Sequence, residues 1–261
     1  MNKKYKILPE TKHKLANGRI VFRIQALKTF HNIRKGDIGG WIESEKNLSQ
    51  KGSCWVYDNA IVTHSAKVKD DAKIQDDAMV AENALICENA IIRNNAVVHD
   101  SAFVFGITVV EDSAAILDNA SICGYSHIKG YARIHDNVLI SGHATVKDNA
   151  EIFNNSRIFG YTTIFENAYI RNGNDIICGN IGKDAFITSV YEDIFHAKIG
   201  KFEITAYRTN YGFMICYYDE FGNYQCIDPK YFKKVIRISH KGKRRKLLLK
   251  TYKVIKEYFK K

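Results

Sequence analysis

A six-residue period runs through the middle of this chain, from Cys54 to Ile176, without an insertion or a deletion. Each unit carries one aliphatic residue, which is Val or Ile in every unit, and usually a small residue (Ala, Ser or Thr) two positions before it. The aliphatic positions are Val56, Val62, Val68, Ile74, Val80, Ile86, Ile92, Val98, Val104, Val110, Ile116, Ile122, Ile128, Ile134, Ile140, Val146, Ile152, Ile158, Ile164, Ile170 and Ile176. A short fixed period of this kind indicates stacked repeats and decides the fold before any single element is assigned.

The spacing inside the unit predicts extended strands. Side chains alternate along a strand, so the aliphatic residue and the small residue two positions earlier point to the same side, which must be the interior. The remaining residues turn a corner, and three units close a triangular coil of eighteen residues. Coils of parallel strands stack about 4.8 Å apart. The twenty-one units therefore predict a prism of about seven coils.

The two ends of the chain do not follow the period. We expect residues 1–53 to cap the first coil, residues 54–182 to form the prism with its close at 179–182, and residues 183–261 to form a small α+β module. Trp41 is expected to cover the end of the core. The module is predicted to contain strands at 186–190, 202–208, 213–218 and 224–227, followed by helices at 229–239 and 243–259.

Residues eighteen apart form columns on the outside of such a prism. One corner column holds Gly106, Gly124, Gly142 and Gly160, each followed by an exposed position. The candidate ligand-binding residues at this corner and beside it are Tyr125, His127, His143 and Tyr161. Apolar residues occupy outward columns on all three faces, which favours a homo-oligomer, with a trimer as the expected form. The alternative is that the C-terminal module folds back over one of these faces.

Charge and cysteine content limit the possible partners. The net charge of +11 gathers at the end of the chain, where residues 230–261 contain fourteen Lys or Arg and one acidic residue. The candidate anion-binding residues in this stretch are Lys241, Lys243, Arg244, Arg245 and Lys246. Six cysteines without metal-ligand spacing predict no metal site and no disulfide framework. These features favour a reducing cytoplasm. The sequence contains no run of 18 apolar residues, so we expect no membrane-spanning segment.

The segment before the repeat resembles a known group of proteins. It contains the stretches RIQAL (23–27), GDIGGWIESE (36–45), NLS (47–49) and CWVYDNA (54–60). These stretches are similar to hexapeptide-repeat proteins encoded by phages and prophages. The resemblance implies a left-handed parallel β-helix, usually trimeric and without an assigned chemistry, in the cytoplasm of a bacterial host cell.

Three functions fit these features. The main hypothesis is a non-catalytic rigid scaffold, without cofactor or catalytic residues, that presents an outer surface to a protein or a small anionic ligand. The alternative is a hexapeptide-repeat acyltransferase, in which an outward histidine (His127, His135 or His143) is the general base. The second alternative is unspecific binding of nucleic acid or another anion through the basic C-terminal helix.

Overall fold

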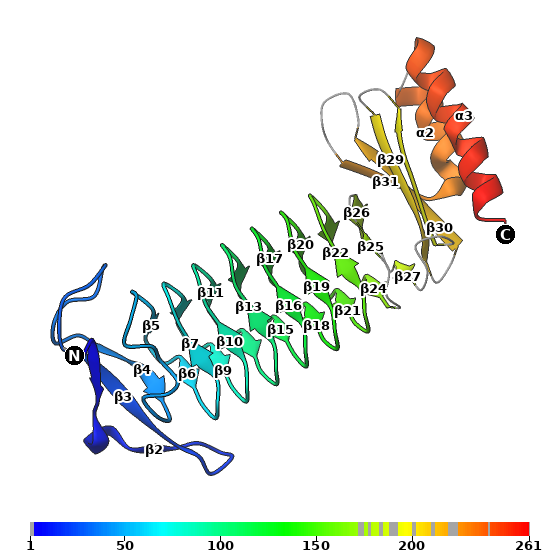
Figure 1. Ribbon diagram of the computed structural model, residues 1–261. Helices are drawn as coiled ribbons and strands as arrows, with labels where there is room; N and C mark the ends of the chain where they lie inside the picture. The colour runs from blue at the N-terminus through cyan, green and yellow to red at the C-terminus, as the bar shows by residue number, and fades with distance from the viewer. Residues whose placement is uncertain are drawn as a thin grey trace.

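The computed structural model describes residues 3–171, 175–176, 179–182, 185–187, 193–199, 202–209, 212–218, 224–239 and 241–260. The chain forms a straight prism with a cap of strands at its N-terminal end and an α+β module at its C-terminal end (Figure 1). The prism is a left-handed parallel β-helix of about eight coils, which confirms the predicted fold class.

Every coil contributes a two-residue strand to each of three parallel sheets. Strands that pair are eighteen residues apart, as Leu85 and Phe103 are. The second residue of each strand points inward, and these Val and Ile side chains are completely buried together with the small residues that precede each strand. The first residue points outward, so the inner columns are uniform while the outer columns vary.

The three sheets hold these strands. Sheet I contains β6 (Ile61–Val62), β9 (Met79–Val80), β12 (Val97–Val98), β15 (Ala115–Ile116), β18 (Arg133–Ile134), β21 (Glu151–Ile152) and β24 (Tyr169–Ile170). Sheet II contains β7 (Lys67–Val68), β10 (Leu85–Ile86), β13 (Phe103–Val104), β16 (Ser121–Ile122), β19 (Leu139–Ile140), β22 (Arg157–Ile158) and β25 (Asp175–Ile176). Sheet III contains β5 (Trp55–Val56), β8 (Lys73–Ile74), β11 (Ile91–Ile92), β14 (Val109–Val110), β17 (His127–Ile128), β20 (Thr145–Val146), β23 (Thr163–Ile164) and β26 (Asn180–Ile181).

The N-terminal cap joins the prism through sheet I. Strand β4 (Ile38–Ile42) pairs in parallel with β6 and so adds a strand before the first hexapeptide unit. Strand β3 (Ile20–Ala26) pairs antiparallel with β4, β1 (Tyr5–Ile7) and β2 (His13–Lys14), and a short 3₁₀ turn (Pro9–Thr11) lies between the last two. An isolated parallel bridge between Leu48 and Val68 extends sheet II in the same way.

The expectation for Trp41 is wrong, because Trp41 is half-buried and the fully buried tryptophan is Trp55. Trp41 pairs with Ile61 in an outward column, where its ring lies 4.3 Å from the Arg23 guanidinium. Trp55 also occupies an outward column, but the cap folds over it and buries it. Its ring makes edge-to-face contacts with Tyr5 and Phe30 at 6.2 and 5.5 Å between centroids.

The stack continues beyond the hexapeptide period at its C-terminal end. Strand β26 reaches its inward residue, Ile181, five residues after Ile176, and β27 (Phe186–Ile187) pairs with β24. The strands of the prism therefore extend past the predicted close at 179–182. The division into three domains at residues 53 and 182 stays a prediction.

The C-terminal module closes the end of the prism. Its antiparallel sheet has the order β28 (Ile194–Ile199), β29 (Phe202–Thr209), β30 (Gly212–Tyr218), β31 (Tyr224–Ile227). Tyr207 and Cys216 from this sheet belong to the same buried cluster as the prism core, and the Gly182 N–H donates to the Tyr207 hydroxyl at 3.2 Å. Helices α2 (Pro229–Ser239) and α3 (Gly242–Tyr258) cover the opposite face of the sheet. The module thus packs on the end of the prism rather than along a face.

Two further features bear on the sequence predictions. Cys216 is disulfide-bonded, although the spacing of the cysteines indicated no disulfide framework, whereas Cys54, Cys87 and Cys123 are free thiols. Among the described residues, no helix is long and apolar enough to cross a membrane.

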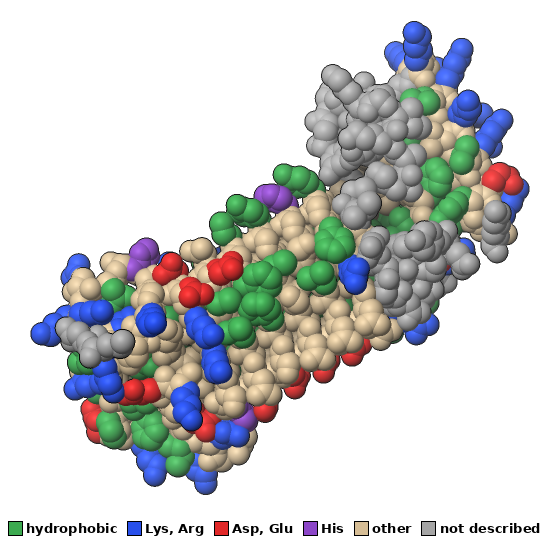
Figure 2. All heavy atoms as spheres, in the orientation of Figure 1, with side chains coloured by type: hydrophobic (Ala, Val, Ile, Leu, Met, Phe, Trp, Pro, Cys, Tyr) green, Lys and Arg blue, Asp and Glu red, His purple; other side chains and the backbone are tan. Residues whose placement is uncertain are grey.

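Basic residues gather at both ends of the molecule (Figure 2). Residues 1–53 contain twelve Lys or Arg against four acidic residues, whereas residues 54–229 contain thirteen against twenty-three. The near-neutral charge of the first 229 residues therefore conceals a basic cap and an acidic prism.

Candidate active site

His127 is the first residue of β17 and projects from sheet III. The next residue, Ile128, fills the inward position of the strand and is completely buried, so the imidazole must lie on the outer face. Its side chain is 35% exposed. The backbone on which it stands is held on both sides, because β17 pairs with β14 and β20. A rigid strand therefore presents a partly exposed histidine.

Glu111 orients this histidine. It belongs to the coil before His127 and follows β14, and its Oε1 lies 2.6 Å from His127 Nε2. Arg93, one coil earlier in the same column, binds the other carboxylate oxygen through Nε at 2.7 Å and through a second nitrogen. The Glu111 side chain is only 12% exposed. The carboxylate thus bridges a guanidinium and an imidazole.

The electrostatics of the bridge favour an ionised carboxylate. Burial alone would raise the pKa of Glu111, but the hydrogen bonds from Arg93 and His127 outweigh it and hold this pKa below its usual range. An ionised Glu111 only accepts hydrogen bonds, so His127 carries its proton on Nε2. In the neutral form of this imidazole, Nδ1 has a lone pair, and no described residue donates to it. Such a histidine, oriented by a carboxylate, is the arrangement expected of a general base.

Two lysines continue the column that contains Arg93 and Glu111. Lys129 and Lys147 occupy the equivalent positions of the next two coils, after β17 and β20. Lys147 Nζ lies 3.6 Å from the carboxylate of its neighbour Asp148 and 5.3 Å from the centre of the Phe165 ring. The edge of sheet III beside His127 is therefore basic on its C-terminal side.

His143 takes part in a different arrangement, a ladder of stacked rings. Tyr125, His143 and Tyr161 lie at the glycine corner, with successive centroids 4.8 and 4.6 Å apart and planes within 5° of parallel. The rings cover each other's faces, and both Tyr125 and Tyr161 are exposed, so the edges of the ladder are open to a ligand. His127 lies on the strand that begins two residues after Tyr125, beside the ladder rather than in it.

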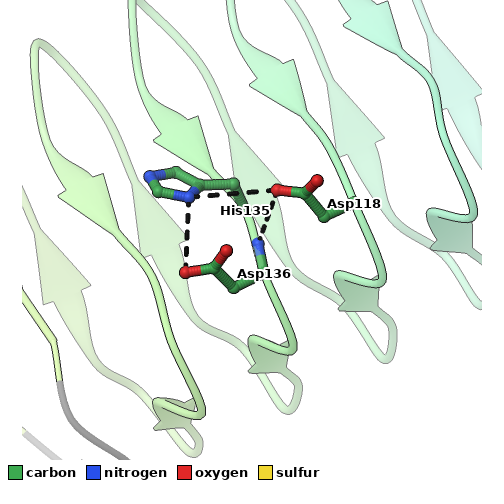
Figure 3. Close-up of side chains that lie close together, drawn as sticks. All are labelled: Asp118, His135 and Asp136. Carbon is green, nitrogen blue, oxygen red and sulfur yellow. Dashed lines mark hydrogen bonds and ion pairs between the residues drawn. The ribbon is translucent and has the colours of Figure 1, made fainter.

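His135 belongs to a third cluster, at the corner that follows sheet I (Figure 3). Its Nδ1 faces the carboxylates of Asp136 and Asp118 at 3.6 and 4.0 Å, and its Nε2 lies 3.2 Å from Glu151. The Phe153 ring stacks on the imidazole at 5.0 Å.

The atoms of His135, Asp118 and Asp136 lie close enough to hold a metal ion. However, the carboxylate oxygens already accept backbone amides, because Asp118 accepts from the Asp136 N–H at 3.0 Å and Asp136 accepts from the Asn154 N–H at 2.8 Å. This corner ladder accounts for the two carboxylates without a metal, and we assign none.

The candidate anion-binding residues lie at the start of α3. Lys241, Lys243 and Lys246 are exposed and Arg245 is half-buried. The side chain of Arg244 lies outside the described part of the structure.

The sequence predictions did not include Arg93 or Glu111 as site residues. Their signal is present in the eighteen-residue columns, where Arg93, Glu111, Lys129 and Lys147 follow one another. The bond between Glu111 and His127, however, joins two different columns and depends on side-chain conformation.

Parts of this chain are similar to a known protein family and to a known protein. A family model described as "GMPPB C-terminal domain" matches residues 56–173, which is less than half of the chain. A protein described as "Uncharacterized acetyltransferase YdcK", from Escherichia coli (strain K12), is 43% identical over 47 residues. That match covers 18% of this chain and 14% of that protein. Together with the stacked strands, these similarities show that the chain contains a hexapeptide-repeat β-helix.

The comparison corrects the main functional hypothesis. The similarity to an acetyltransferase overturns the prediction of a non-catalytic scaffold that is not an enzyme, and it favours the acyltransferase alternative. The physical reason for the error is that the inner columns of the prism are the same in either case. Only the outer side chains distinguish an inert rod from an enzyme.

Proposed function

We propose that the protein is an acyltransferase that moves an acetyl group, or a related short acyl group, from a thioester donor to a hydroxyl or amine acceptor. The observation that carries the proposal is the hydrogen bond of 2.6 Å between His127 and the half-buried, arginine-bound Glu111 on the outside of a hexapeptide-repeat prism. The similarity to an acetyltransferase supports it.

In the proposed reaction, Nδ1 of His127 removes the proton of the acceptor as its oxygen or nitrogen attacks the thioester carbonyl carbon. A bond forms between acceptor and acyl carbon, the carbon–sulfur bond breaks, and the thiolate takes the proton back from the imidazolium. Glu111 stabilises the positive charge that His127 carries between these steps. Arg93 is a positioning residue, because it holds Glu111 but does not contact His127 in the described structure.

The neighbouring residues have proposed roles in binding. The edges of the Tyr125, His143 and Tyr161 ladder border the strand of His127, which supports the proposal that they line one side of the bound donor or acceptor. The columns of apolar outward residues support a homotrimer. The segment 36–49 supports a phage or prophage origin and a place in the bacterial cytoplasm, which the genes surrounding the coding sequence would test.

The first prediction concerns His127 and Glu111. We expect His127→Asn to lower kcat for transfer from acetyl-coenzyme A by about 10²–10⁴-fold, since it removes the base. Glu111→Gln keeps an oxygen that can accept from His127 but removes the negative charge that stabilises the imidazolium, and the loss is expected to be roughly 10–100-fold. The measurement is release of free thiol with a panel of amine and hydroxyl acceptors.

The matched control is His143→Asn, which changes an outward histidine of the same sheet edge without touching the Glu111 bridge. We expect this variant to keep kcat within about threefold of the unchanged protein, because a positioning contact to substrate affects mainly KM. Full activity in His127→Asn, or equal losses in both variants, would contradict the proposed base.

A further inference from the structure

The outer faces of α2 and α3 form a strongly basic surface at the tip of the molecule. Of the fourteen positions described as exposed in these helices, nine are Lys or Arg and one, Glu257, is acidic. The nine are Lys230, Lys233, Lys234, Arg237, Lys243, Lys246, Lys250, Lys253 and Lys256. We call this set the basic tip (Figure 2).

Few of these cations have an anionic partner in the protein. Lys230 pairs with Asp228 at 3.2 Å, and Glu257 pairs with Lys260, just beyond the set, at 2.6 Å. Lys233 and Lys256 lie 5.8 and 5.9 Å from the Tyr252 ring. No carboxylate among the described residues lies within ion-pair distance of the other members. Crowded like charges repel one another, and a polyanion would relieve that repulsion.

The opposite faces of the helices are committed to the core of the module. Phe232, Ile236, Leu248 and Ile255 are buried there against the sheet, and the Tyr252 hydroxyl donates to the Pro229 carbonyl at 2.9 Å. A basic helix that binds a bilayer must bury an apolar face in it. Three large apolar side chains of these helices, Tyr231, Ile238 and Val254, are exposed, but nine cations surround them on the same surface, which disfavours a membrane as the partner.

We infer that the basic tip binds the phosphate backbone of double-stranded nucleic acid without reading its sequence. Lys243, Lys246, Lys250 and Lys253 recur every three or four residues of α3, which places them about 5 Å apart along its axis. A duplex carries one charge per roughly 1.7 Å of its length, so every lysine in this row has phosphates within reach. Lysine contacts to phosphate position a protein but carry no sequence information.

The charge on the rest of the molecule determines from which side a nucleic-acid duplex can approach. The acidic prism lies on the other side of the module sheet and repels a polyanion, so the duplex contacts the end of the rod and not its flank. This binding function is separate from acyl transfer and does not depend on it.

The test compares two triple variants of the full chain that change the net charge equally. Lys246→Gln/Lys250→Gln/Lys253→Gln removes three members of the basic tip. Lys12→Gln/Lys14→Gln/Lys35→Gln removes three exposed lysines of the N-terminal cap. Binding to a short mixed-sequence DNA duplex is followed by fluorescence anisotropy at several salt concentrations. All six side chains are exposed, and circular dichroism verifies that both variants fold.

We expect the tip variant to lose at least about tenfold in affinity and its salt slope to fall by roughly 2.7, which corresponds to three phosphate contacts. The cap variant is expected to bind within about twofold of the unchanged protein. Equal losses in the two variants would show that affinity depends only on the net charge of the protein and not on the position of the lysines, and would overturn the inference. Capture of the protein by phosphatidylserine vesicles, without DNA binding, would also overturn it and identify a lipid surface instead.

Discussion

At the scale of single residues, the corners of the prism reach a positive φ mainly in two ways, either with Asp, Asn or Glu or with Gly. Each corner needs one residue with positive φ. Most corners use Asp, Asn or Glu, and the side chain of that residue accepts the backbone N–H of the corner residue in the next coil, as Asp118 does for Asp136. Gly106, Gly124 and Gly142 have φ values of 74–78° and no such side chain. A Cβ on Gly124 would lie 2.8 Å from the backbone N and O of Gly142.

This contrast predicts different outcomes for two substitutions of Gly124. In Gly124→Asn, the backbone has a precedent in Asn94, which adopts a φ of 57°, and the new amide oxygen offers an acceptor to the next coil. In Gly124→Val, the branched side chain strongly disfavours positive φ.

We expect the free energy of unfolding of the Val variant to lie about 1–2 kcal/mol below that of the Asn variant, as measured by urea denaturation. Equal stabilities would show that the corner does not require its present backbone conformation.

At the scale of elements, the N-terminal cap is fastened to the prism by a buried lysine. Lys4 in the cap is 1% exposed, and its Nζ donates to the carbonyls of Cys54, Lys51 and Gly52 at 2.9, 3.3 and 3.4 Å. The Cys54 Sγ lies 3.3 Å from the same nitrogen. Burial lowers the pKa of Lys4 and raises the pKa of the Cys54 thiol. One ammonium group thus donates hydrogen bonds to three backbone carbonyls of the turn that leads into the first coil.

Lys4→Met keeps most of the apolar stem but removes the donor. We expect it to lower the free energy of unfolding by about 1–3 kcal/mol, because buried carbonyls lose a hydrogen-bond partner. Lys6→Met, an exposed position on strand β1, which begins directly after Lys4, is the matched control and should change stability by less than about 0.5 kcal/mol. Thermal and urea unfolding measure both, and a neutral Lys4→Met would contradict this role.

At the scale of the whole molecule, the apolar outward columns bear on assembly. Ile61, Met79 and Val97 follow one another in sheet I, and Phe103 and Phe105 stack on the face of sheet II with centroids 4.3 Å apart. Figure 2 shows hydrophobic side chains gathered midway along the prism.

We expect light scattering to give a mass near three times the 29.8 kDa of one chain. Val97→Lys, which places a charge in the sheet I column, should shift the population toward single chains, whereas Thr145→Lys on sheet III serves as the comparison. A mass near 29.8 kDa for the unchanged protein would contradict the homotrimer.

The period of six was sufficient to predict the inner columns and the three parallel sheets, and the sequence after Asp228, outside that period, predicted both terminal helices. It could not identify which Trp is buried, because Trp41 and Trp55 occupy equivalent outward positions and only the fold of the cap buries one of them. Strand β28 was not predicted either, although the three strands that follow it in the module were. The bridge from Arg93 through Glu111 to His127 was missed because eighteen-residue columns are set by the backbone, whereas this bridge is set by rotamers.

Along the chain, strands of sheets I, II and III alternate in a fixed order. The number of units therefore sets both the length of the prism and the rotation of one end relative to the other. Adding eighteen residues would move the basic tip about 4.8 Å farther from the N-terminal cap and leave the two ends in the same rotational phase. Adding six would turn everything downstream by a third of a revolution, so that the surface bearing His127 would face a different side of the cap. Length and orientation along this rod are therefore set by counting residues.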